Sequence, residues 1–310
     1  MTKQEKGLST ARKKELIFYC LMFALPVLQI LIFYFYVNFR SISLAFTEYD
    51  AETGKYFFVG IENFIKIIEG VHPKMSNFNI NFILKNTSLA FTMELLFGFI
   101  PAIFFSYYIF KKYPLSGVFK VILYTPHIVS TIIFVVIYRN FVESALPQIS
   151  EKLFGIEIQD VFNQVNEGRT RFFMIFFTVF IGFGTRVLLY SGAMSSISES
   201  VIESGELEGV KPLQELVFIV VPLIWGTVVT FLVVCIVGIF SNQMTAYSFF
   251  GESLDTKYYT FGYYLYYRAT KLDMAEYPYL STLGLLMTLF AVPVTLCTRY
   301  LLNKYGPRTD

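Results

Sequence analysis

Six long apolar runs constrain the fold of this 310-residue chain more than any other feature. Each reaches the roughly 20 residues that a helix needs to cross a bilayer. The runs cover residues 16–39, 83–110, 118–138, 172–194, 217–240 and 279–302. Charged residues make up 15% of the chain, against roughly 25% in an average soluble domain. We therefore expect an all-α, multi-pass membrane protein with six transmembrane helices.

The distribution of Lys and Arg predicts the orientation of these spans. An even number of spans places both ends of the chain on one side of the membrane. On that side, which also holds the 195–216 loop, Lys and Arg are about twice as dense as in the opposite loops, and cytoplasmic loops are the positive ones. The cluster of Lys3, Lys6, Arg12, Lys13 and Lys14 supplies most of the difference. We predict a cytoplasmic N-terminal segment 1–15, a single transmembrane domain 16–310, and cytoplasmic ends.

A polar segment at 195–222 separates the fourth and fifth apolar runs and carries helix signals of its own. Two S-x-x-E patterns fit the capping box, in which side chains satisfy free backbone N–H groups of a first helical turn. These pairs are Ser196 with Glu199 and Ser200 with Glu203. Gly205 and Gly209 permit a tight turn or the close approach of another backbone. Pro212 suits the first turn of a helix. The pattern predicts a short helix, a glycine turn and a second helix.

Two ionisable residues lie deep inside predicted spans, where charge is costly and indicates function. Glu94 stands about eleven residues, and Arg186 about fourteen residues, from the outer ends of spans that both run inward, so their depths differ by roughly 5 Å. Long side chains can bridge that difference. Glu94 and Arg186 are therefore predicted to pair or to line one wet cavity. Alternatively, Arg186 reaches the cytoplasmic interface while Glu94 forms a local hydrogen bond.

Polar and aromatic residues follow the fifth run. Ser241, Asn242 and Gln243 could face a hydrated pathway, or they could simply mark the end of a span. The loop beyond them is rich in tyrosine, which at membrane ends forms an interfacial belt. Contact with a sugar or a partner protein is the alternative role for these side chains. The tyrosines are Tyr247, Tyr258, Tyr259, Tyr263, Tyr264, Tyr266, Tyr267 and Tyr277.

Several classes of function lack their residues in this sequence. Gly54-Lys55 is the one Gly-Lys pair, and it has neither the earlier glycine nor the following Ser or Thr of a phosphate-binding P-loop. Cys20, Cys235 and Cys297 all fall inside apolar runs, which argues against a metal cluster or a disulfide framework. A net charge of +2 gives no argument for nucleic acid. We expect a chain that is no enzyme and binds no cofactor or metal.

The 195–222 segment resembles the cytoplasmic "EAA" loop of binding-protein-dependent ABC-importer permeases. Glu203-Ser204-Gly205 occupies the Glu-Ala-Ala place, and Gly209 stands six residues after Glu203. Glu208-Gly209-Val210 is similar to the family's Asp-Gly-Ala, and Ile219 and Pro222 complete the tail. Ser and Gly replace two alanines here, and Glu208 replaces aspartate.

The resemblance extends along nearly the whole chain, toward the first of the two permease subunits in maltose- and glycerol-phosphate-type importers. The similar stretches, in the family's order, are Phe46-Thr47-Glu48-Tyr49, Phe58-Val59-Gly60-Ile61-Glu62-Asn63-Phe64, Asn86-Thr87, Tyr124-Thr125-Pro126 and Thr260-Phe261-Gly262-Tyr263. Such a resemblance implies a permease subunit in a bacterial cytoplasmic membrane that imports a sugar or oligosaccharide. Its partners would be a paralogous permease, a pair of identical ATP-binding subunits that hold ATP and Mg, and an extracellular solute-binding protein.

The resemblance also implies roles for particular residues. Those that would dock on the ATPase, in the coupling helix between spans four and five, are Glu203, Ser204, Gly205, Glu208 and Gly209. Those along the substrate pathway would be Ser241, Asn242, Gln243 and Tyr247. Two alternatives are a non-sugar solute such as glycerol phosphate, and an ion-coupled secondary transporter in which Glu94 and Arg186 act as the relay.

Overall fold

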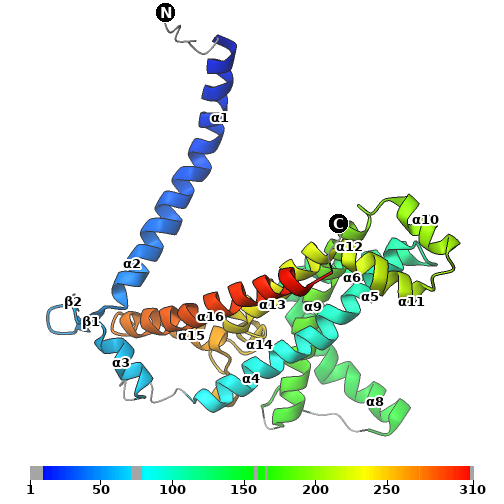
Figure 1. Cartoon of the computed structure of the whole chain (residues 1–310). Coiled ribbons are helices and arrows are strands. Elements are labelled where there is room, and N and C mark those ends of the chain that lie inside the picture. The colour runs from blue at the N-terminus through cyan, green and yellow to red at the C-terminus, as the bar shows by residue number, and fades with distance from the viewer. Residues whose placement is uncertain (1–9, 71–78, 157–159, 165, 272, 308–310) are drawn as a thin grey trace, which may run out of the picture. The chain divides into compact units, whose positions relative to one another are not determined.

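The computed structural model describes residues 10–70, 79–156, 160–164, 166–271 and 273–307 (Figure 1). The first nine residues, including Lys3 and Lys6 of the predicted N-terminal segment, lie outside this part of the chain. The chain divides into two compact units, one of Met1–Met75 with Leu272–Leu286 and one of Ser76–Lys271 with Met287–Asp310. Each unit is described by itself below.

The first unit begins with one long apolar helix followed by a hairpin. α1 (Thr10–Gln29), the π-helix η1 (Ile30–Tyr36) and α2 (Val37–Leu44) follow one another without a break, and this helix contains the predicted first span. Strands β1 (Thr47–Asp50) and β2 (Lys55–Phe58) pair antiparallel, and α3 (Glu62–Ile68) follows. The buried Asn63 amide donates to the carbonyls of Ala45 and Thr47, which fixes α3 against the start of the hairpin.

The second unit holds most of the membrane-spanning helices. In chain order its elements are α4 (Ile80–Met93), η3 (Glu94–Phe99), α5 (Ile100–Phe110), α6 (Ser116–Ile128), α7 (Thr131–Asn140), η4 (Phe141–Ala145), α8 (Leu146–Phe154), α9 (Glu167–Met194), α10 (Glu199–Leu207), α11 (Pro212–Glu215), η5 (Leu216–Val220), α12 (Val221–Leu223), α13 (Trp225–Ser241), α14 (Ala246–Phe250), η6 (Thr256–Tyr258) and α15 (Phe261–Thr270). α16 (Tyr277–Tyr305) runs through both units.

The described residues contain five helices that are long and apolar enough to cross a membrane, and a sixth if one bent pair counts as a single span. The five are Lys13–Leu44, Ile80–Phe110, Thr131–Phe154, Glu167–Met194 and Tyr277–Tyr305. The bent pair, Pro212–Leu223 with Trp225–Ser241, covers the predicted fifth span and turns by 80°. Pro222 precedes the bend, and its missing backbone N–H removes a helical hydrogen bond there.

The predicted third span, 118–138, is wrong in its bounds. α6 ends at Ile128, Val129 and Ser130 are extended, and a new helix begins at Thr131. Pro126 removes a backbone donor in the last turn before this break. The long apolar helix continues instead through Thr131–Phe154. Residues 139–154, between the predicted third and fourth spans, are therefore a continuation of that helix.

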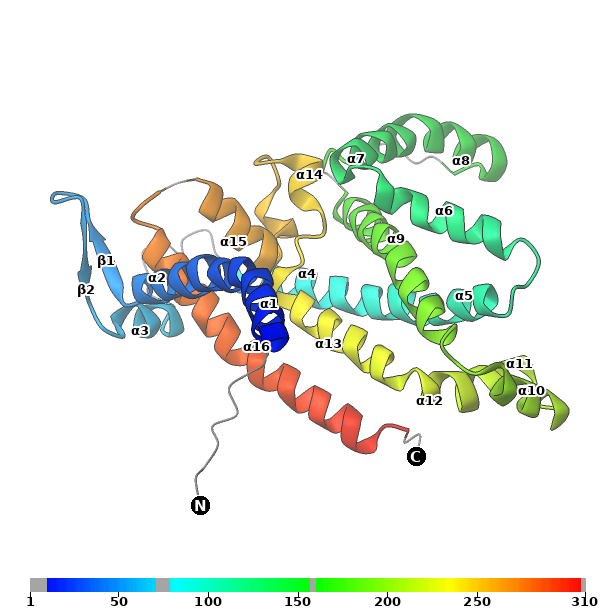
Figure 2. The same ribbon diagram turned by 90° about the horizontal axis from the view of Figure 1, so that it is seen from above.

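α9 is the central helix of the second unit, because it packs against both α5 and α6 (Figure 2). α9 approaches α6 most closely at Gly184, where an added Cβ would lie 1.8 Å from the backbone oxygen of Leu123 on α6. On α5, the buried Ser106 hydroxyl donates to the carbonyl of Val187 on α9 at 2.9 Å. These contacts hold α5, α6 and α9 at short helix-to-helix distances.

Asn86 ties the middle of α4 to the 257–259 stretch and to α9. Its fully buried amide donates to the carbonyls of Lys257 and Tyr259 at 2.8 and 3.0 Å. Its Oδ1 accepts a hydrogen bond from Nε of Arg171, which is itself buried. One side chain thereby satisfies three polar groups from two distant parts of the sequence.

Asn86→Ala is expected to lower the free energy of unfolding by about 3 kcal/mol, because it leaves buried carbonyls and a guanidinium without this partner. Thermal unfolding of the detergent-solubilised protein measures the effect. Asn81→Ala, at an exposed position of the same helix, is the matched control and should change stability by about 0.5 kcal/mol or less. Equal effects at the two positions would contradict the role of Asn86.

Candidate functional site

The segment 195–216 folds into the predicted helix, glycine turn and helix. α10 ends in two hydrogen bonds, from Gly209 N to Glu206 O at 3.0 Å and from Val210 N to Gly205 O at 3.1 Å. This is a Schellman motif, and it requires the left-handed conformation that Gly209 adopts with φ of +77°. Pro212 occupies the first turn of α11. Both α10 and α11 lie at one end of the second unit in Figures 1 and 2.

The two predicted capping boxes are wrong. α10 begins after Ser198, whose hydroxyl pairs with that of Ser200 at 2.7 Å instead of capping the helix. Ser196 Oγ donates backward to the carbonyl of Ala193. Ser200 lies inside the helix, so it has no free first-turn N–H to accept from. A serine hydroxyl can bond to a nearby backbone carbonyl or side chain instead of capping a helix, and Ser196 and Ser198 do so here.

The residues predicted to dock on a partner do not all share one face. Glu203, Ser204, Glu208 and Gly209 are exposed, whereas Gly205 is buried. An added Cβ on Gly205 would lie 2.9 Å from Cδ1 of Ile219. The small size of Gly205 therefore allows α10 to pack against η5 of the same chain.

Two exposed leucines on this segment escaped the sequence analysis. Leu207, at the end of α10, is 89% exposed, and Leu213 on α11 is 61% exposed. Burial of such a leucine against a partner would be favourable by about 2 kcal/mol. The signal in the sequence was a Leu between Glu206 and Glu208. The exposed leucines give this end of the molecule an apolar contact point among acidic residues.

Lys111 joins the second span to the segment 195–216 and was also missed. Its ammonium lies 2.6 Å from Oε1 of Glu206 and 3.1 Å from Oε1 of Glu215. Burial lowers the pKa of Lys111, but hydrogen bonds to Glu206 and Glu215 outweigh burial and leave that pKa above its ordinary value of 10.5. This pairing stabilises the fold below pH 10.5 and is lost as pH rises through the raised pKa. The ammonium is thus charged at neutral pH.

The same end of the unit is built on a shared apolar core. Its buried members come from six helical elements and from the connection between α12 and α13: Phe99, Ala102, Tyr107, Val187, Tyr190, Met194, Ile202, Leu216, Val220, Ile224 and Val228. Side chains of η3, α5, α9, α10, η5 and α13 therefore pack as one cluster. The segment 195–216 is anchored to the spans by this cluster and by Lys111.

A second polar site lies inside the spans, where the structure brings Glu94 and Arg186 into contact. Arg186 Nη2 donates to Glu94 Oε1. The side chain of Arg186 is 12% exposed and that of Glu94 is 21% exposed. Asn242 Nδ2 donates to the other carboxylate oxygen at 3.2 Å. The three residues come from the second span, α9 and the end of α13. A carboxylate, a guanidinium and an amide thus form one network in an apolar setting.

Glycines make room for the guanidinium of Arg186. An added Cβ on Gly98 would lie 2.6 Å from its Nη1, and one on Gly182 would lie 3.0 Å from its Nη2. Glu94 also opens the π-helical turn η3, and such turns are frequent at functional sites. A small hollow beside Glu94 has a mixed lining of polar and apolar residues, among them Thr87, Cys235 and Asn242. The site is therefore shaped around its charged pair.

The predicted pathway residues after α13 separate in the structure. Asn242 joins Glu94, and its own Oδ1 accepts from Met244 N at 2.7 Å. Ser241 ends α13 and is exposed, and Gln243 is half-buried. Tyr247, on α14, packs edge-on against Tyr266 with ring centroids 4.9 Å apart. The structure brings Asn242 alone of these residues to the charged pair.

The interfacial-belt prediction is wrong for four of the tyrosines. Tyr258, Tyr259, Tyr263 and Tyr264 are at most 6% exposed. Tyr263 stacks on Tyr267 at an interplanar angle of 6°, and its hydroxyl donates to the carbonyl of Gly251 at 2.7 Å. These four side chains are therefore buried within the chain.

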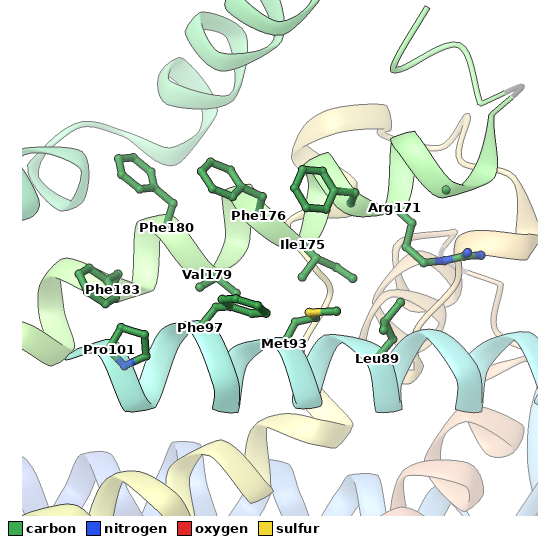
Figure 3. Close-up of a pocket in the computed structure, with 12 residues that line it drawn as sticks. Leu89, Met93, Phe97, Pro101, Arg171, Ile175, Phe176, Val179, Phe180 and Phe183 are labelled. Carbon is green, nitrogen blue, oxygen red and sulfur yellow. The ribbon is translucent and has the colours of Figure 1, made fainter. Parts of the chain in front are cut away.

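An apolar groove of about 580 Å³ runs between the second span and α9 (Figure 3). Its lining consists of Leu89, Met93, Phe97, Pro101, Gly168, Arg171, Phe172, Ile175, Phe176, Val179, Phe180 and Phe183. Ile175 and Val179 of α9 lie toward Met93 and Phe97 of the second span in this view. The groove offers few hydrogen-bonding groups. Among the described residues, no cluster of His, Cys, Asp and Glu is placed to hold a metal ion.

These features define a multi-pass helical membrane protein with a polar intramembrane site and a helix pair presented at one end. The chain belongs to the family of binding-protein-dependent transport system inner membrane components, whose model matches residues 94–310. It is accordingly a permease, a transport subunit and not an enzyme. The matched region contains Glu94, Arg186, Asn242 and the segment 195–216.

Solved structures share the fold over nearly the whole chain. One is the crystal structure of a bacterial ABC transporter involved in the import of the acidic polysaccharide alginate, with a TM-score of 0.75 and 18% identity over 95% of this chain and 97% of that chain. Another is the crystal structure of the bacterial alginate ABC transporter in complex with an alginate pentasaccharide-bound periplasmic protein. Its TM-score is 0.73, and its identity is 18% over 94% of this chain and 96% of that chain. No curated protein matches the chain.

Proposed function

We propose that the chain is the transmembrane permease subunit of an ATP-driven importer that carries a sugar or oligosaccharide inward from an extracellular binding protein. The observation that carries the proposal is the segment 195–216, a helix pair that presents exposed Glu203, Leu207 and Leu213 while its other side is anchored to the spans. Membership of the binding-protein-dependent family supports the binding-protein partner. The shared fold with alginate importers favours a saccharide.

In this proposal the protein lies in a bacterial cytoplasmic membrane with both termini and the segment 195–216 in the cytoplasm. A paralogous permease completes the pathway, and two identical ATP-binding subunits hold ATP and Mg. Glu203, Ser204, Glu208 and Gly209 contact the ATPase, with Leu207 as the apolar anchor. Closure of the ATPase pair on ATP displaces the docked segments and rocks the spans between inward- and outward-facing states.

The intramembrane network of Glu94, Arg186 and Asn242 is the proposed polar part of the solute pathway. Its carboxylate and amide can exchange hydrogen bonds with a hydroxyl-rich solute. The charges of Glu94 and Arg186 compensate each other, which suits a neutral sugar better than a phosphate ester. Ser241, Gln243 and Tyr247 are proposed to contact the solute further outward.

Leu207→Glu is expected to weaken co-purification of the ATPase with the permease complex by about tenfold or more, because it places a charge where an apolar anchor enters a groove. Leu207 is 89% exposed, so the change should leave the fold intact. Pull-down of the ATPase from detergent-solubilised membranes measures the effect.

The matched control is Leu115→Glu, at a 67% exposed leucine in the connection between α5 and α6, which lies on the same predicted side of the membrane. This variant should retain the ATPase. If the double variant Leu207→Glu/Glu203→Lys still retained the ATPase, the docking proposal would be overturned. Uptake of radiolabelled saccharides by reconstituted complexes, compared with glycerol phosphate, decides the solute class.

A further inference from the structure

One cation connects the second span with both short helices of the segment 195–216. Lys111 follows directly on α5, and its side chain is 15% exposed. Its ammonium contacts Glu206 of α10 and Glu215 of α11 at 2.6 and 3.1 Å. Three helices thus meet at one ammonium group.

Both carboxylates depend on this ammonium. Glu206 lies in the last turn of α10, where the negative end of the helix dipole disfavours a carboxylate. Glu215 has 3% of its side chain exposed, and a buried carboxylate is costly unless it is paired. Helix propensity alone does not explain an acid at either place, whereas the position of Lys111 does.

On its other side, Lys111 is continuous with the helix that carries the intramembrane site. Ser106, one turn earlier, donates to the carbonyl of Val187 on α9. Glu94, at the start of η3 in the same long helix, accepts from Arg186 of α9. A displacement of α10 that is passed to Lys111 therefore reaches α5, α9 and the Glu94 network together.

We propose that Lys111 is a positioning residue that fastens the segment 195–216 to the second span, so that movement of the docked segment moves the helix bearing Glu94. This inference rests on the proposed function. In this proposal Glu206 links Lys111 to the docking helix α10, and the buried Glu215 holds the Lys111 side chain in position. The ATPase binds the opposite, exposed side of α10.

Cys235 supplies a readout that needs no knowledge of the solute. It lines the small hollow beside Glu94 and Asn242. With Cys20 and Cys297 replaced by Ser, the rate at which N-ethylmaleimide labels Cys235 reports access to this hollow. The rate is measured in the full complex in proteoliposomes, once without nucleotide and once trapped with ATP and vanadate. In the otherwise unchanged complex the two rates should differ.

Glu206→Gln is expected to shrink this nucleotide-dependent difference by about fivefold or more, while the ATPase stays bound and hydrolyses ATP. Glu206 is 56% exposed, so the variant keeps the buried Lys111–Glu215 pair. The double variant Lys111→Gln/Glu215→Gln removes both buried charges together. It should assemble with the ATPase but show the same loss of response.

Two variants serve as controls. Lys112→Gln changes the neighbouring exposed lysine and should respond to nucleotide like the unchanged protein. Lys111→Arg keeps a cation that reaches both carboxylates and should retain most of the response. A loss in Glu206→Gln with retention in these two supports the inference.

Other outcomes overturn it. If Glu206→Gln and the double variant respond to nucleotide like the unchanged complex, Lys111 does not transmit the movement. If these variants lose the ATPase, the residues act in docking and the inference is wrong. If the unchanged protein binds no ATPase, or shows no difference between the two states, the proposed function fails and the inference fails with it.

Discussion

Arg186→Gln is expected to lower the free energy of unfolding by about 3 kcal/mol, because it leaves the Glu94 carboxylate inside the spans without its cation. The glutamine is also too short to fill the space that Gly98 and Gly182 leave for the guanidinium. Glu94→Gln should cost a similar amount, since it leaves the guanidinium of Arg186 unpaired. Denaturant titration of the purified protein in mixed micelles measures both changes.

The double variant Glu94→Gln/Arg186→Gln carries the decisive comparison. It removes both charges and leaves two amides that can hydrogen-bond, so it should be more stable than either single variant. Glu252→Gln breaks an exposed ion pair with Lys271 and should cost less than about 1 kcal/mol. A double variant no more stable than the single ones would show that Glu94 and Arg186 do not stabilise each other.

Gly184→Ala is expected to destabilise the protein by about 3 kcal/mol, because the added methyl group has no space. It would lie 1.8 Å from the backbone oxygen and 2.7 Å from the backbone carbon of Leu123. Backbone atoms of a packed helix cannot rotate away as a side chain can, so α6 would have to shift away from α9. Loss of the folded fraction on heating in detergent measures the effect.

Gly192→Ala tests the same substitution on the same helix where nothing lies within 4 Å of the added Cβ. Alanine is the better helix former, so this variant should be neutral or gain up to about 1 kcal/mol. The difference between the two variants isolates the packing of α6 against α9. Equal stability of Gly184→Ala and Gly192→Ala would contradict the close approach of these helices.

Much of the secondary structure was predictable because it depends on neighbours along the chain. The apolar runs at 83–110, 172–194 and 279–302 lie within the helices Ile80–Phe110, Glu167–Met194 and Tyr277–Tyr305. The glycine turn at Gly209 and the helix start at Pro212 follow from local backbone chemistry. Where local signals compete, prediction failed. The run at 118–138 is interrupted after Pro126, and serine hydroxyls at 196–200 bond to other groups than first-turn N–H groups.

The candidate sites were predictable in part. Similar depths in the membrane pointed to Glu94 and Arg186, but the contact between their side chains depends on the rotation of two helices about their axes. Asn242 joins them from 148 residues away, and no local pattern indicates that. Lys111 looked like an ordinary basic residue at the end of a span. Its partners Glu206 and Glu215 are 95 and 104 positions away.

By itself, the sequence determined that this chain is a helical membrane protein with a helix–glycine turn–helix between two apolar runs, because hydrophobicity, proline and glycine act over a few residues. The tertiary structure alone decided that Gly205 faces Ile219, that four tyrosines turn inward, and that Lys111 holds the segment 195–216 to the second span. These contacts join residues from separate helices. They depend on how the helices pack, and packing is a property of the whole fold.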